Sequence, residues 1–176
     1  MNPTNWKIDP AHSELQFKVK HLMISTVTGN FNEFQAEVKT PGEDFSKASI
    51  LAGINLASID TGSTQRDEHL KSPDFFDVAQ FPSMNFTAKA IKTLPQPGEY
   101  QITGDLTIRD TTKEFTFNCT FAGIAKDPYG NTKAGFSLEG TLNRKEFGLT
   151  WNVALETGVL VGDQVRILGE IQLIKA

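Results

Sequence analysis

The sequence predicts an all-β fold in which antiparallel strands close into one barrel. Apolar and polar residues alternate with a period of two along most of the chain, which is the pattern of strands with one buried face. Turn signals separate these runs, and no long helical pattern lies between them. We count about eight to ten strands, which indicates a sandwich or a barrel, and a closed barrel pairs that many without leaving an exposed sheet edge.

The alternation is clearest between Tyr100 and Arg109, where Ile102 and Leu106 point to one face and their polar neighbours to the other. The expected strands are 15–20, 31–39, 48–57, 84–91, 100–109, 114–121, 136–142, 149–155 and 165–173. Turns are expected at Pro41-Gly42, 95–98, Asp110-Thr111, 127–131 and Gly162-Asp163.

A stretch without alternation, 61–82, interrupts the strands. Ser63 or Thr64 suits the N-cap of a short helix, and Pro73 would stop that helix. The stretch also holds apolar side chains that need a surface to cover: Leu70, Phe75 and Phe76. An open barrel end provides such a surface, so we expect segment 66–77 to cap one end of the barrel.

Length and charge restrict the class of protein. A chain of 176 residues suits a single domain, which we expect to span 1–176. The net charge is −4 and the basic residues are scattered among acidic ones, which argues against nucleic acid and anionic membrane surfaces as partners. There is no run of about 18 apolar residues, so we expect no transmembrane helix. The first residues lack a basic stretch followed by an apolar one, so we expect a cytoplasmic protein, or a periplasmic one if a leader peptide has been removed.

We expect neither a metal site nor a catalytic residue. Of the three histidines, His12 and His21 flank one strand, which holds them roughly 30 Å apart. At that separation these two cannot bind one metal ion, so a site made of all three with His69 is not expected. Residues 66–69 contain acidic and basic side chains, but no nucleophile motif accompanies them. An ion-pair and capping role is therefore favoured for that cluster, and no cofactor is expected.

The aromatic residues are mostly Phe: 13, against 2 Trp and 2 Tyr. Phe buries a large apolar area without needing a hydrogen-bond partner, so it suits a dry core or a dry cavity. A small barrel either fills its interior with side chains or holds one ligand, and periodicity alone does not separate these cases. Gly104, Gly140 and Gly169 on inward faces favour a cavity, because a missing side chain leaves space.

Motifs spread in order along the chain resemble a known family. They are Trp6-Lys7-Ile8-Asp9-Pro10-Ala11-His12-Ser13, then 17–22, 27–31, 58–61, 66–77, 81–86, 104–109 and 143–148. In these motifs the chain is similar to the YceI-like family of polyisoprenoid-binding, lipocalin-like proteins, and segment 66–77 is fairly specific to it. The resemblance implies an extended eight-stranded antiparallel barrel around an apolar tunnel, in which family members bind an isoprenoid or similar amphiphile.

These observations lead to a carrier hypothesis, in which a long-chain isoprenoid or lipid is carried or sequestered in a continuous tunnel. A ten-residue strand rises about 33 Å and, once tilted, gives a barrel about 25 Å tall, which fits a long chain. The alternation of inward and outward positions along each expected strand, which we call strand parity, gives the tunnel lining: Phe17, Phe86, Phe115, Phe117, Phe121, Phe136 and Trp151. Arg66 and His69 would meet the head group at a polar mouth. A stress-linked interaction module with a filled barrel, an enzyme acting on a lipid, and a homodimer stay open.

Overall fold

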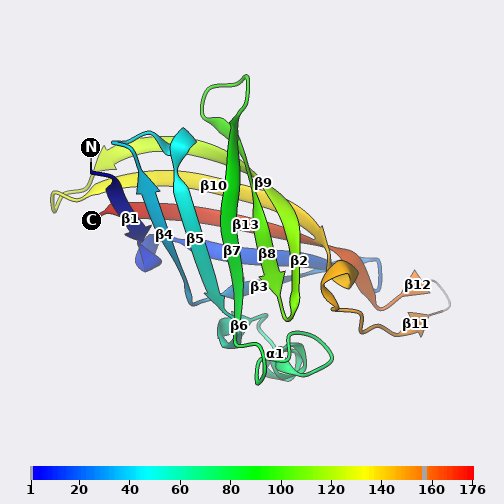
Figure 1. Cartoon of the computed structure of the whole chain (residues 1–176). Coiled ribbons are helices and arrows are strands. Elements are labelled where there is room, and N and C mark those ends of the chain that lie inside the picture. Colours follow the sequence, from blue (N-terminus) through cyan, green and yellow to red (C-terminus); the bar gives the residue numbers. More distant parts are fainter. Residues whose placement is uncertain (1, 156–157) are drawn as a thin grey trace.

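Antiparallel strands wrap around one interior, as Figure 1 shows for the computed structural model, which describes residues 2–155 and 158–176. The strands are β1 Thr4–Ile8, β2 Glu14–His21, β3 Ser25–Phe31, β4 Phe34–Thr40, β5 Ser49–Asn55, β6 Ile59–Asp60, β7 Ser83–Thr93, β8 Glu99–Ile108, β9 Thr111–Lys126, β10 Thr132–Asn143, β11 Ala154–Leu155, β12 Gly158–Val159 and β13 Val161–Lys175. The helix α1 spans Thr64–Lys71, and the 3-10 helices are η1 Pro10–His12, η2 Phe45–Lys47, η3 Leu56–Ser58 and η4 Arg144–Phe147.

The strands close into an eight-stranded antiparallel barrel. The order of hydrogen-bonded neighbours is β1-β4-β5-β7-β8-β9-β10-β13, and β13 pairs back with β1, where Trp6 lies opposite Lys175. Strands β2, β3 and β6 continue the ring along its first three members, because β2 pairs with β13, β3 with β2 and β6 with β3. Each of the pairs β1–β2, β3–β4 and β5–β6 therefore acts as one interrupted strand, and the expected eight-stranded barrel is confirmed.

Short irregular segments interrupt these three strands. The strand expected over 31–39 forms as β4 from Phe34 onward, but its first residues depart from the prediction, because Phe31 ends β3 and residues 32 and 33 belong to neither strand. The backbone N–H groups of Asn32 and Glu33 leave the ladder and donate to the carbonyl and the hydroxyl of Ser58. That contact joins the break to η3, so the interruptions of neighbouring strands support one another.

The stretch without alternation folds as a cap, as the sequence predicts. The Ser63 hydroxyl accepts from the backbone N–H of Arg66 at the start of α1, and the helix ends at Ser72. Beyond it, Phe75 is buried, and Leu70 and Phe76 pack against the main core cluster. Both chain termini lie at the other end of the barrel, remote from β11 and β12 (Figure 1).

The strand expected over 149–155 is wrong for most of its length. Only β11 forms there, paired with β12, and residues 148–153 are irregular. The reason is the buried guanidinium of Arg144, which donates to the backbone carbonyls of Leu149 at 2.5 Å and Trp151 at 2.9 Å. These carbonyls have a side-chain partner in place of a neighbouring strand, so the segment satisfies its polar groups without a ladder.

Candidate binding site in the barrel interior

Two apolar chambers adjoin inside the barrel. The cap chamber has a volume of about 230 Å³, and its apolar lining includes Phe17, Leu70, Phe75, Phe76, Leu142 and Trp151. The far chamber has a volume of about 170 Å³, and its lining includes Ile8, Val38, Phe45, Phe86, Phe117 and Leu173. The cap chamber lies under α1, and the far chamber lies toward β1.

The two chambers meet at Met84 and Ile167, a junction that we call the partition, since these two side chains line both chambers. They come from β7 and β13, which stand opposite one another in the ring of eight strands. The interior is thus resolved as two adjoining chambers, and the continuity expected for the tunnel stays a prediction. Strand parity gives the direction in which a side chain points, and it does not tell which inward side chains reach across the axis.

Polar side chains gather at the cap chamber. Its lining includes Lys20, His21, Arg66, His69 and Arg144, and Lys20 and Arg66 are exposed to solvent. Among the described residues, no Lys, Arg, Asp, Glu or His lines the far chamber. The interior is thus graded, from a polar rim near α1 to an apolar pocket beneath β1.

Hydrogen bonds fix the polar side chains of α1 at that rim. Arg66 donates through Nε to the hydroxyl of Thr61 at 2.7 Å and through a terminal nitrogen to the Thr61 carbonyl at 2.6 Å. Nε2 of His69 lies 2.9 Å from a carboxylate oxygen of Asp74. Arg66 and His69 share the face of the helix that meets the cap chamber, as their spacing of three predicts.

The residues that parity assigned to a tunnel divide between the chambers. Phe17, Trp151, Arg66 and His69 line the cap chamber. Phe86, Phe117 and Phe136 line the far chamber. Phe115 and Phe121 are absent from both linings: the ring of Phe115 packs on Phe117, with centroids 4.7 Å apart, and Phe121 packs on Phe45 and Phe136.

Gly104 and Gly140 do not leave the open space that the sequence analysis expected, whereas a Cβ atom on Gly169 would make ordinary contact, 3.4 Å from Leu138. A Cβ atom on Gly140 would come within 2.7 Å of the Phe115 ring, and one on Gly104 would meet the Phe86 ring at 2.8 Å and the Thr87 carbonyl oxygen at 2.2 Å. Phe rings lie directly over these glycines. The missing side chains therefore let large rings pack closely against the sheet, which is a known pairing of aromatic residues with glycine in sheets.

Arg144 is the main interior residue that the sequence analysis missed. It is 2% exposed, lines the cap chamber and donates to backbone carbonyls of Gly162 and Val161 as well as to the irregular segment. Burial lowers its pKa, while the carboxylate of Asp163 acts in the opposite direction. The sequence signal that could have indicated this role is the position of Arg144 directly after β10, a strand with an apolar inward face.

Cys119 is a second residue that the analysis did not place at the site. It lines the far chamber and is 3% exposed. Burial raises the pKa of its thiol to about 12, so the thiol is protonated at neutral pH and behaves as a small apolar side chain.

Within residues 2–155 and 158–176, no group of three His, Cys, Asp or Glu side chains is arranged to hold a metal ion. None of the helices in the described part of the chain is long and apolar enough to span a membrane. The groups available to a ligand are therefore apolar walls and a few cations and imidazoles at one rim.

A closed antiparallel barrel with an apolar interior and a helical cap defines a lipocalin-like barrel protein. The chain belongs to the YceI-like domain family, whose model matches residues 6–173. It is 41% identical over 165 residues to a UPF0312 protein of Staphylococcus aureus strain USA300, covering 93% of each chain.

Solved structures share the fold. The Campylobacter jejuni YCEI protein is 30% identical, with a TM-score of 0.73 over 89% of this chain and 90% of that one. A polyisoprenoid binding domain from Saccharophagus degradans is 12% identical, with a TM-score of 0.70 over 97% of this chain and 98% of that one. At the second identity the likeness concerns the fold alone.

Proposed function

We propose that this protein binds the tail of a long-chain amphiphile, a polyisoprenoid or similar lipid, inside its barrel and carries or sequesters it unchanged. The observation that carries the proposal is the graded interior: apolar walls throughout, with the charged side chains of the described lining confined to the cap chamber. An amphiphile has the same distribution of polarity. The shared fold of the polyisoprenoid binding domain supports this class of ligand.

The affinity would come chiefly from the tail. Each methylene group that leaves water for an apolar wall contributes about 0.8 kcal/mol. A short tail can be held in the cap chamber, whereas a long one must pass between Met84 and Ile167 to reach the far chamber. Met84 is unbranched and flexible, so its side chain can adapt to a chain that passes beside it.

Binding without chemistry accounts for the polar groups at the rim. His69 is hydrogen-bonded to Asp74, but among the described residues no Ser, Thr or Cys lines the cap chamber with it. A histidine in nucleophilic catalysis needs such a partner within hydrogen-bond reach.

Tail-length dependence tests the proposal. Protein stripped of bound lipid is titrated with fluorescent fatty acids and prenyl probes of increasing length, using wild type and an Ile167→Trp variant that narrows the partition. Loss of several methylene contacts should weaken binding of long probes at least about tenfold, with a smaller effect on short ones. Ile124→Trp, at a partly exposed site on β9, is the matched control.

Two results would contradict the proposal. One is a wild-type protein that binds no probe saturably and yields no amphiphile on solvent extraction and mass spectrometry, which would make the barrel a filled core. The other is an unchanged length dependence in Ile167→Trp, which would place the probe outside the chambers.

A further inference from the structure

Large apolar side chains project into solvent at the β2–β3 hairpin. The three consecutive loop residues Leu22, Met23 and Ile24 are 38%, 55% and 82% exposed, and Val153, just before β11, is 43% exposed. We call these four residues the apolar tip. Clustered large apolar side chains exposed on a globular protein mark a site that contacts a protein partner, a ligand or a membrane.

The backbone of this hairpin is strained. Leu22 has a φ angle of 56° and Met23 one of 62°, both in the left-handed region. Asn and Gly adopt that region readily, which is why they dominate tight hairpin turns. A Leu-Met pair at this turn is thus unfavourable for the isolated protein for two reasons. The backbone adopts a left-handed conformation that these residues disfavour, and their apolar side chains are exposed to water. Such an outlier indicates a role outside the fold's own stability.

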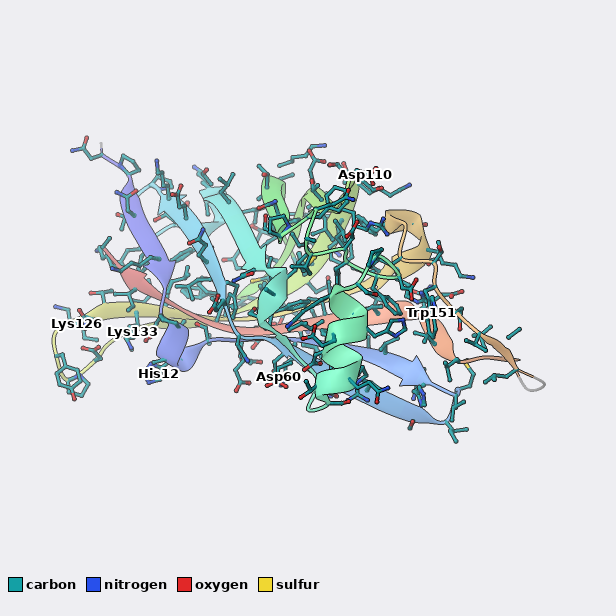
Figure 2. The ribbon with its side chains drawn as sticks, turned by 90° about the horizontal axis from the view of Figure 1, so that it is seen from below. His12, Asp60, Asp110, Lys126, Lys133 and Trp151 are labelled. Atoms are coloured by element: carbon teal, nitrogen blue, oxygen red, sulfur yellow. The ribbon has the colours of Figure 1, made fainter. Side chains whose placement is uncertain are left out.

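The apolar tip adjoins the mouth of the cap chamber. The backbone N–H of Leu22 donates to the carbonyl of Leu160 at 2.9 Å, and Leu160, His21 and Lys20 all line the cap chamber. The β2–β3 hairpin and the β11–β12 ribbon project from the same end of the barrel, near Trp151 (Figure 2). A surface that received the tip would therefore lie against the chamber mouth.

Within the β2–β3 hairpin after Glu14, unlike over the chain as a whole, the charges are basic. Between Glu14 and Glu33 the chain carries Lys18, Lys20 and His21 and no acidic residue. Across the sheet, the carboxylate of Asp163 lies 3.4 Å from Nζ of Lys145 and is already paired. Apolar side chains flanked by lysines suit a membrane surface with anionic head groups.

We propose that the apolar tip inserts into the surface of a lipid bilayer containing anionic lipid and so sets the cap chamber mouth on the membrane. Docking would allow direct exchange of the ligand with the bilayer, and this purpose rests on the proposed function. The docking itself does not depend on that function. A second copy of this chain fits less well, because a stable protein interface takes roughly 20–30 residues a side. A few inserted apolar side chains suffice at a membrane.

A Leu22→Asn/Met23→Gly variant gives the sharpest test, since it removes two apolar side chains and the strain together. Wild type should sediment with vesicles of phosphatidylcholine containing about a quarter phosphatidylglycerol, and less so at high salt. The variant should show a higher denaturant midpoint and a partition coefficient lower on the order of 100-fold. Ile24→Ser should lower it about tenfold. The control, Leu51→Ser/Tyr129→Ser, removes side chains that are 54% and 88% exposed elsewhere and should sediment like wild type.

Equal sedimentation of the wild type and the tip variants, or a wild type that stays in the supernatant, would overturn the proposal. So would a wild-type dimer that becomes monomeric in the tip variants while neither binds vesicles, because the occupant would then be a second copy. Titration with a fluorescent fatty acid in the absence of vesicles separates the two levels. If the probe binds but the wild type does not sediment, docking fails and the proposed function stands.

Discussion

The imidazole of His69 meets the indole of Trp151 edge to face, with ring centroids 4.6 Å apart and planes at 90°. Phe75 completes the cluster, at 5.1 Å from His69 and 5.5 Å from Trp151. Figure 2 shows Trp151 beside the helix of the cap. These three rings join segment 66–77 to the irregular segment after η4, so the two loops that close the cap chamber support one another.

Removal of Phe75 should loosen this closure. Phe75 is 6% exposed, so Phe75→Ala is expected to lower the free energy of unfolding by about 3 kcal/mol. Phe76→Ala should have a smaller effect because Phe76 is only partly buried. Denaturant titration monitored by fluorescence and circular dichroism measures both changes. Midpoints equal to wild type would mean that the segment is a surface loop.

Arg66→Ala tests the rim without disturbing the core. Arg66 is exposed and bonds to Thr61 only, so we expect a change in unfolding free energy of under about 1 kcal/mol. If Arg66 contacts the head group, the release rate of a fluorescent fatty acid should rise several-fold. Gln65→Ala, the neighbouring exposed position on α1, is the control. A release rate equal to wild type would remove Arg66 from the site.

Arg144→Met should destabilise the loops around the cap chamber. The substitution removes the donors to the carbonyls of Leu149, Trp151 and Gly162, and each buried carbonyl left without a partner costs about 1–3 kcal/mol. We expect a loss of at least about 3 kcal/mol and faster hydrogen exchange in residues 149–153. Lys145→Met, at a half-exposed neighbour, should change stability by less than about 1 kcal/mol. Equal effects of the two would show that the carbonyl contacts are unimportant.

The glycines under Phe rings should differ in their tolerance of a methyl group. Gly104→Ala brings Cβ to 2.2 Å from the Thr87 carbonyl oxygen, a backbone atom that cannot move freely. Gly140→Ala meets the Phe115 ring, which can shift at a lower cost. We expect losses of about 3 kcal/mol or more for Gly104→Ala and about 1–2 kcal/mol for Gly140→Ala. Gly135→Ala, with its nearest neighbour at 3.5 Å, is the control. The reverse order in thermal unfolding would contradict this reading.

A buried ion pair at the end away from the cap should make stability depend on acid pH. The carboxylate of Asp9 lies 2.6 Å from Nζ of Lys133 and 2.7 Å from Nδ1 of His12, and Figure 2 shows His12 and Lys133 at the end remote from Trp151. The hydrogen bond from Lys133 is the main cause that holds the pKa of Asp9 below its ordinary value of 3.8. A lowered carboxyl pKa stabilises the fold above the unfolded value, and this stabilisation is lost as the pH falls through the folded value.

Comparison of wild type with Asp9→Asn isolates this contribution. The difference in unfolding free energy should be full at about pH 6 and should shrink below about pH 4. Urea titrations across that range measure it, with Asp110→Asn, an exposed turn carboxylate, as the control for loss of one charge. A difference that stays constant down to about pH 2 would contradict the assignment.

Local signals were sufficient for the strands that run without interruption. The alternation over 100–109 matches β8, whose inward residues Ile102, Leu106 and Ile108 are buried. The cap was also predictable, because a helix N-cap and a group of apolar side chains without strand parity are local features. The strand expected over 149–155 was wrong because Arg144, five and seven residues before Leu149 and Trp151, supplies the hydrogen bonds that a neighbouring strand would have made. Alternation alone does not show that this nearby Arg is buried and turned toward those carbonyls.

The sequence by itself determined most of the strands and the helical cap, because a period of two and turn chemistry depend on neighbouring residues, and the family resemblance implied the eight-stranded barrel. Only the tertiary structure decided how the interior is shared between side chains and space. Phe86 and Phe115 cover glycines on adjacent strands, and Met84 and Ile167 reach the partition from opposite walls. These contacts depend on strand register, twist and closure, which bring residues far apart in the chain to the same depth in the barrel.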